Sequence, residues 1–193
     1  MRARTVLLLP ALLILAQATG EARQKQFGAP ETFSANIAAS GAKGGAAAAT
    51  IQIDIQRYTP DADRTAVEDA LKSGGSAAFL TALRKAPEVG SVSFADQKWP
   101  IRWAREQPSG KYNRTIVVVT DQPIFFVGGG SAKAKPREGY DVALIKIDVD
   151  NVGLGKGTMT AAAKVKPGAD GGVEIDDYAE KPIQLVTVSR KLK

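Results

Sequence analysis

Short segments with strand character, separated by turn residues, follow one another along the chain from residue 89 onward. They span residues 91–94, 101–106, 112–120, 124–127, 142–150, 158–166, 173–178 and 183–190. Many short strands with turn signals at roughly 8 to 12 residue spacing are typical of an antiparallel barrel or sandwich. The sequence therefore predicts a mainly β (α+β) fold, with a single antiparallel β-barrel and a two-sheet sandwich as the two alternatives.

Two further strands are predicted nearer the N-terminus. Isoleucines at positions 51, 53 and 55 alternate with polar residues, which places one face of this strand in a core and the other in water. Residues 31–40 form a candidate first strand. The glycine-rich stretch at 41–45 is a turn between the two, because glycine adopts backbone angles that other residues resist.

A pair of short amphipathic helices is predicted as an insertion at about residues 60–86. Thr59-Pro60 offers a helix N-cap followed by proline at the first helical position. The first helix ends at the glycine pair 74–75, and the second begins at Ser76. We expect one set of apolar side chains from both helices to be buried together on the sheet: Leu71, Phe79, Leu80 and Leu83.

The N-terminus has the three-part pattern of a secretory signal peptide. Arg2 and Arg4 precede an apolar run at residues 6–16, and small residues follow at the expected cleavage site near Ala18. The run is too short for the roughly 20 residues that a membrane-spanning helix needs. We therefore expect cleavage near Ala18 and a product that is periplasmic or extracellular.

This pattern divides the chain into three segments. Residues 1–18 form the signal peptide, residues 19–30 a flexible leader and residues 31–193 a single β-rich domain. The chain has no cysteine, so the domain folds without disulfides and lacks the residue that carries the lipid of a bacterial lipoprotein. We expect no transmembrane or lipid anchor.

Charge and composition exclude several classes of function. The net charge of +6 is mild, and most basic residues are interspersed with acidic ones, so no nucleic acid partner is expected. The sequence contains neither histidine nor cysteine. Serine–histidine catalysis, cysteine–histidine catalysis and the usual zinc sites are therefore excluded. No cofactor, metal ion or catalytic residue is predicted.

Three polar motifs have ordinary structural interpretations. The run from Asp148 to Gly153 departs from a calcium loop and is predicted to be a hairpin turn. The glycines at 128–130 lack the order of a phosphate-binding loop and are predicted to be a surface loop. Glu174 and its acidic neighbours up to Glu180 are predicted to form a solvated strand face rather than a glycosidase pair.

One aromatic stripe is the candidate ligand site. Trp99, Trp103 and Arg105 recur at a period of two along one predicted strand, and Tyr112 follows across the expected hairpin. Aromatic rings beside an arginine can stack on and pair with an anionic or sugar-like ligand. The alternative is that these rings pack in the core, which is the commoner fate of such a stripe.

Several segments resemble a family of small exported bacterial proteins. The resemblance runs through IQIDIQRYTPDADRTAVEDALKSGGSAAFLTALRKAPEVG and continues in IRWAREQ, RTIVVVTDQPI, YDVALIKIDVD, GKGTMTAAAKV and VEIDDYAEKPIQLVTV. It covers most of the chain after the signal peptide, in order. It implies export and a shared fold, and it carries over no catalytic residue.

The leading functional hypothesis is non-enzymatic binding of a small amphipathic ligand or a protein partner. One alternative is a structural or envelope-associated interaction protein, and a second is a carboxylate-dependent hydrolase. An exposed apolar patch or open sheet edge is expected of the first alternative. Two carboxylates facing each other in a cleft are expected of the second.

Overall fold

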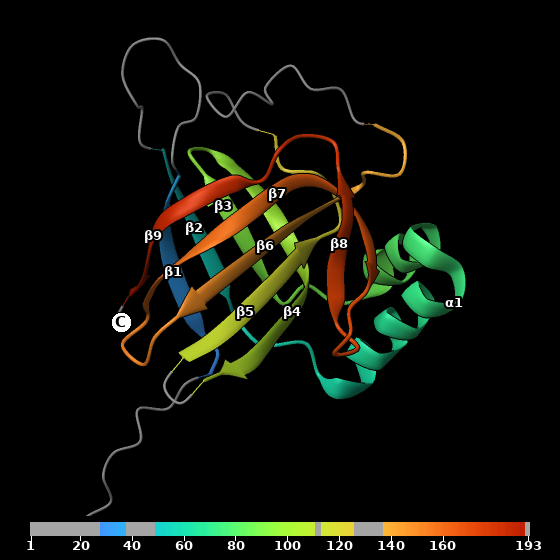
Figure 1. Ribbon diagram of the computed structural model, residues 1–193, viewed down its shortest axis with the longest axis horizontal. Coiled ribbons are helices and arrows are strands. Elements are labelled where there is room, and N and C mark those ends of the chain that lie inside the picture. Colours follow the sequence, from blue (N-terminus) through green and yellow to red (C-terminus); the bar gives the residue numbers. More distant parts are fainter. Residues whose placement is uncertain (1–27, 38–48, 111–112, 126–136, 192–193) are drawn as a thin grey trace, which may run out of the picture.

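The computed structural model describes residues 28–37, 49–110, 113–125 and 137–191. These residues form nine strands and one helix (Figure 1). The elements are β1 Glu31–Ile37, β2 Ala49–Ile55, α1 Asp61–Lys85, β3 Gly90–Phe94, β4 Gln97–Ser109, β5 Asn113–Thr120, β6 Val142–Val149, β7 Leu154–Pro167, β8 Val173–Tyr178 and β9 Ile183–Lys191. The predicted signal peptide at 1–18, most of the leader, the turn at 41–45, Tyr112 and the glycine loop at 128–130 lie outside the described residues.

The strands form one antiparallel sheet that closes into a barrel. Their order is β6-β5-β4-β3-β2-β1-β9-β7-β8, and an additional pairing of β6 with β7 closes eight of them. The ninth, β8, pairs with β7 beyond the closed part. Of the two predicted architectures, the antiparallel barrel is confirmed and the sandwich is wrong. The strand predicted at 124–127 is also wrong where it is described, because Ile124 and Phe125 are not in a strand.

Apolar side chains fill the interior of the barrel. The isoleucines of β2 point inward with no exposed surface, as their alternation predicts. Phe33 of β1 and Ile116 of β5 meet them there, also with no exposed surface. An eight-stranded barrel is just wide enough for side chains to fill it. The interior is therefore a hydrophobic core.

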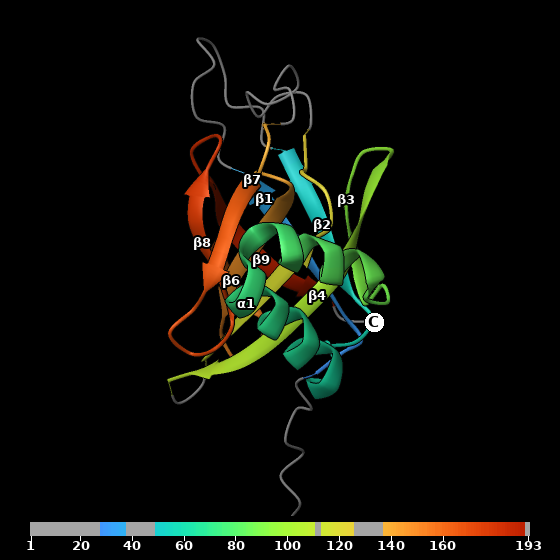
Figure 2. The same ribbon diagram turned by 90° about the vertical axis from the view of Figure 1, so that its right-hand side faces the viewer.

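The helix α1 lies across the outside of the barrel, where it covers a second apolar cluster (Figure 2). Leu71, Phe79 and Leu83 are buried in that cluster, and Leu80 is partly buried against it, as predicted. The two predicted helices form one element with a break at Gly75, whose φ of 66° and ψ of −161° are not helical. This positive φ favours glycine, so the glycine pair gives a kink between two helical segments.

The kink holds α1 against β7. Beyond Ala163, β7 runs past the end of β6 and continues only in its pairing with β8. At this point Ser76, the first residue after the kink, donates its hydroxyl to the Val165 carbonyl at 2.9 Å. The same hydroxyl accepts the Val165 amide at 3.3 Å. One side chain therefore satisfies both backbone groups of Val165 and joins the helix to the extended hairpin.

Replacement of Ser76 with alanine should destabilise the fold by about 1 to 3 kcal/mol, because it leaves partly buried backbone groups of Val165 without a partner. Urea denaturation measures this loss. Ser73→Ala is the matched control, since the Ser73 hydroxyl is exposed and, within the described residues, bonds only to the Asp69 carbonyl of its own helix. An equal effect of the two substitutions would contradict the joining role of Ser76.

Candidate functional site

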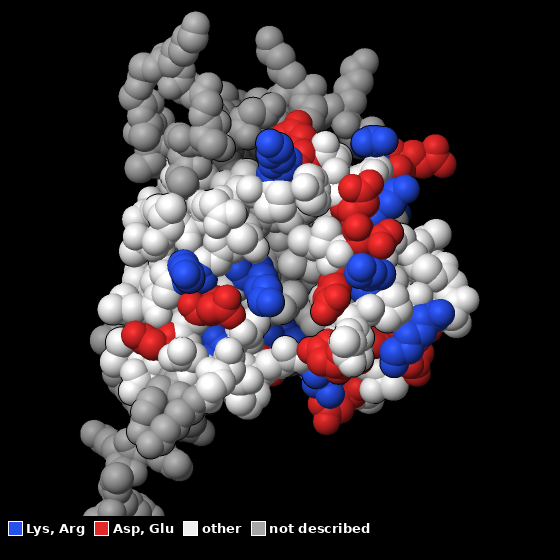
Figure 3. All heavy atoms as spheres, in the orientation of Figure 1, with Lys and Arg blue, Asp and Glu red and all other residues white. Residues whose placement is uncertain are grey.

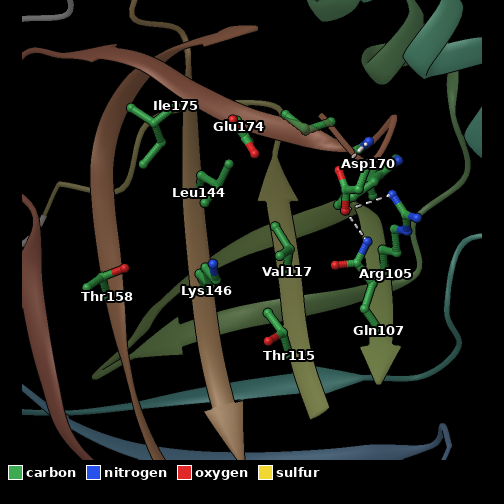
Figure 4. Close-up of a pocket in the computed structure, with 13 residues that line it drawn as sticks. Arg105, Gln107, Thr115, Val117, Leu144, Lys146, Thr158, Asp170, Glu174 and Ile175 are labelled. Atoms are coloured by element: carbon green, nitrogen blue, oxygen red, sulfur yellow. Dashed lines mark hydrogen bonds and ion pairs between the residues drawn. The ribbon is translucent and has the colours of Figure 1, made fainter. Parts of the chain in front are cut away.

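A cavity of about 300 Å³ lies outside the barrel, between the outer face of β4 to β7 and the β8 hairpin (Figure 4). We call this cavity the outer groove. Strand residues of the barrel wall form its floor. Its roof consists of Asp170 and Gly172, from the turn between β7 and β8, and of Val173, Glu174 and Ile175.

Side chains that pair across the strands form three rows on the outer face of β4 to β7, and part or all of each row lines the floor. The apolar row is Trp103, Val119, Leu144 and Thr160; the middle row is Arg105, Val117, Lys146 and Thr158; the polar row is Gln107, Thr115, Asp148 and Lys156. The apolar row is buried beneath α1 and β8, whereas the polar row reaches solvent. The outer groove is therefore apolar at the end beneath α1 and polar and solvent-exposed at the opposite end.

A β-bulge in β4 decides which residues of that strand face the groove. The register shifts between Ile101 and Trp103, so Arg102 is an extra residue. As a result Trp99 and Ile101 lie in the barrel core, whereas Trp103 lies in the cluster outside it. The prediction that Trp99, Trp103 and Arg105 project from one face is therefore wrong for Trp99.

Asp170 fastens the roof to the barrel wall. Its carboxylate accepts a hydrogen bond from the Gln107 side chain on β4 and another, at 2.9 Å, from the Gly172 amide. Arg105 lies 3.5 Å from the same carboxylate (Figure 4). The hydrogen bond from Gln107, followed by that from Gly172, holds the pKa of Asp170 below its usual value. Asp170 therefore stays ionised near neutral pH.

Arg105 links the barrel wall to both the roof and the helix. Besides Asp170, it lies 3.9 Å from Glu68 of α1, which is buried. Burial raises the pKa of Glu68, and the charges of Arg105 and Arg64 partly oppose that effect. Arg105 thus lies where the helix, the roof and the barrel wall meet. On the surface of this side of the molecule, acidic and basic side chains are intermixed (Figure 3).

A second group of charged residues lies among the barrel strands and is largely buried. Arg114 of β5 forms ion pairs with Glu31, which is 2% exposed, at 2.5 Å and with Glu106 at 3.0 Å. Arg190 approaches Glu31 at 3.3 Å, and the Tyr58 hydroxyl donates to it at 2.9 Å. Burial opposes ionisation of Glu31, but Arg114, Tyr58 and Arg190 outweigh it and hold its pKa below the ordinary value. These side chains bond to one another, so we assign this group to the fold.

Of the four predicted site residues, the structure brings two to the groove. Trp103 and Arg105 line it, Trp99 lies in the core, and Tyr112 is outside the described residues. Sequence reasoning missed Lys146 and Asp170. Both belong to segments that were interpreted only as strand or turn. Strand register places Lys146 in the same row as Arg105, and the hairpin turn brings Asp170 to 3.5 Å from Arg105.

Other predicted features have structural roles. The Asp150 side chain accepts the Val152 and Leu154 amides at 2.9 Å each, so the calcium-like motif is the predicted hairpin turn. Among the described residues, no group of three or more acidic side chains is arranged to hold a metal ion. No helix within that part of the chain has both the length and the apolar character needed to cross a membrane.

Comparisons with protein-family models, with curated proteins and with solved structures found no match to this chain.

Proposed function

We propose that this protein is an exported, non-enzymatic binding protein that holds a small amphipathic molecule in the outer groove. The observation that carries the proposal is the ordered change along the floor, from Leu144 in the apolar row to Thr115 in the polar row. Ligand sites combine apolar walls with a few placed polar groups and begin at about 300 Å³. The signal-like pattern at residues 1–18 supports export.

The roof supports binding over hydrolysis. A carboxylate-dependent hydrolase needs one carboxyl group that can donate a proton. Asp170 and Glu174 are the described carboxylates that line the groove, and the lowered pKa of Asp170 leaves it without a proton near neutral pH. The hydrogen bonds of Asp170 with Gln107 and Gly172 give it a structural role, because they fasten the roof to the barrel wall.

The two tryptophans of the chain provide a test, because they lie on opposite sides of the barrel wall. In a Trp99→Phe variant the remaining indole, Trp103, lines the outer groove. A panel of small amphipathic molecules should include ligands that change its fluorescence in a saturable way. The edge of the Trp103 indole reaches the groove lining, so a ligand there changes the polarity beside the ring and with it the emission.

Trp103→Phe is the matched control, because its remaining tryptophan lies in the barrel core. The same ligands should leave its fluorescence unchanged. Melting temperatures of both variants verify that they are folded. An equal response in the two variants would move the binding site away from the groove, and no response to any molecule of the panel would refute the proposal.

A further inference from the structure

The middle row of the groove floor carries two cationic side chains, Arg105 on β4 and Lys146 on β6, with Val117 between them. Two strand spacings separate them, or about 10 Å at the backbone. We infer that the ligand carries a carboxylate that lies over Val117 between these two cations, with its apolar body directed toward Leu144 and Ile175. This inference rests on the proposed function of the groove.

The guanidinium of Arg105 has N–H donors that can bind a ligand. Its side chain is 19% exposed, and its two carboxylate neighbours lie at 3.5 and 3.9 Å, beyond ordinary N–H···O hydrogen bonds. No hydrogen bond of its guanidinium is found within the described residues. A guanidinium has five N–H donors in a planar fork that matches a carboxylate.

Lys146 is the second cation and projects from the floor (Figure 4). It is exposed, and within the described part of the chain it takes part in no ion pair or side-chain hydrogen bond. Its cross-strand neighbours, Val117 and Thr158, are neutral. An ammonium group there can meet a ligand anion without first breaking an internal pair.

Asp170 and Glu68, at 3.5 and 3.9 Å, offset part of the charge of Arg105, whereas Lys146 forms no ion pair within the described residues. Asp170 is held by Gln107 and Gly172 in the roof, and Asp148 accepts the Thr115 hydroxyl in the polar row. Glu174 lines the roof, on the opposite side of the groove from the floor cations. An anionic ligand can therefore pair with the ammonium group of Lys146 and accept hydrogen bonds from guanidinium N–H groups of Arg105 that carry none within the described residues.

Three probes with the same chain test the inference in the Trp99→Phe protein: octanoate, octanamide and octylamine. Octanoate should bind at least about tenfold more tightly than the other two, because only its charge complements the floor. Lys146→Met and Arg105→Gln should each weaken octanoate binding about tenfold and leave octanamide binding unchanged. Lys156→Met is the control, since it removes the same charge from the polar row, outside the groove lining.

The outcomes separate this inference from the proposed function. Equal binding of the three probes, or preference for octylamine, would overturn the carboxylate while the groove remains the binding site. A loss in Lys156→Met as large as in Lys146→Met would mean that general charge, not the middle row, attracts the probe and would also overturn it. Failure of all three probes to change Trp103 fluorescence would count against the groove itself. If Arg105→Gln does not fold, the Lys146→Met result decides.

Discussion

Replacement of Arg114 with methionine should lower the free energy of unfolding by about 3 to 5 kcal/mol, one of the two largest losses that we expect. The substitution keeps an apolar stem but leaves Glu31, which is 2% exposed, without its closest cation. A buried charge that loses its partner costs this much in proteins. Arg190, at 3.3 Å from Glu31, offsets only part of the loss. Urea denaturation at about pH 7 measures it.

The pH dependence of this loss has a definite sign. The pKa of Glu31 in the folded protein lies below its ordinary value of 4.5, so its stabilising effect is complete above about pH 4.5 and declines as the pH falls further. In the Arg114→Met protein, protonation of Glu31 instead removes an uncompensated charge. The difference between the two proteins should therefore narrow in acid.

Arg57→Met is the control for this experiment, because Arg57 is exposed. It should change stability by less than about 0.5 kcal/mol. A loss below about 1 kcal/mol in Arg114→Met, or a difference from wild type that widens in acid, would contradict the role of the buried ion cluster.

The second large effect is expected at Trp103. Its side chain is 1% exposed and packs with Leu144 and Val165 in the cluster beneath α1. Truncation to alanine removes a large buried ring and leaves a cavity, which costs about 3 to 5 kcal/mol. Because the side chain is almost fully buried, only its edge reaches the groove lining. Thermal melting of the Trp103→Ala protein checks this loss.

Trp103→Phe should lose much less stability than Trp103→Ala. The indole Nε1 is buried without a hydrogen-bond acceptor in the described residues, and phenylalanine removes this unpaired donor while it keeps most of the apolar volume. Similar losses in the two variants would indicate that the indole nitrogen, rather than ring volume, matters at this position.

Local patterns were sufficient to predict the elements of the barrel. The alternation in β2 predicted its inward isoleucines, and the bounds of β8 were predicted to the residue. The choice between barrel and sandwich depends on the pairing of β6 with β7, which joins strands that either architecture can contain. Such a long-range pairing leaves no local pattern in the sequence, so both alternatives stayed open.

The site was harder to predict, because the single extra residue of the β4 bulge, Arg102, changes which side chains face the groove. A period of two along β4 predicts that Trp99 and Trp103 lie on the same face of the strand. The bulge at Arg102 places them on opposite faces. Pro100 is a residue type that accompanies bulges in strands, but it does not tell at which residue the register shifts. Likewise, only the register places Lys146 in the same row as Arg105, and only the fold of the hairpin brings Asp170 to 3.5 Å from Arg105.

The position of the outer groove has a consequence for how such a protein can diversify. On β5, Ile116 and Val118 point into the barrel, while Thr115 and Val117 point into the groove. Alternate residues of the same strand thus face the packed interior of the barrel and the groove that we propose as the binding site. Substitutions at the groove-facing residues of β5 need not disturb the packed interior. The outward positions of the apolar row are packed beneath α1, so libraries should be randomised only at outward positions that reach solvent, such as Thr115, Val117 and Lys146. Such libraries should retain a high fraction of folded members, which makes this part of the wall a suitable scaffold for selecting new specificities.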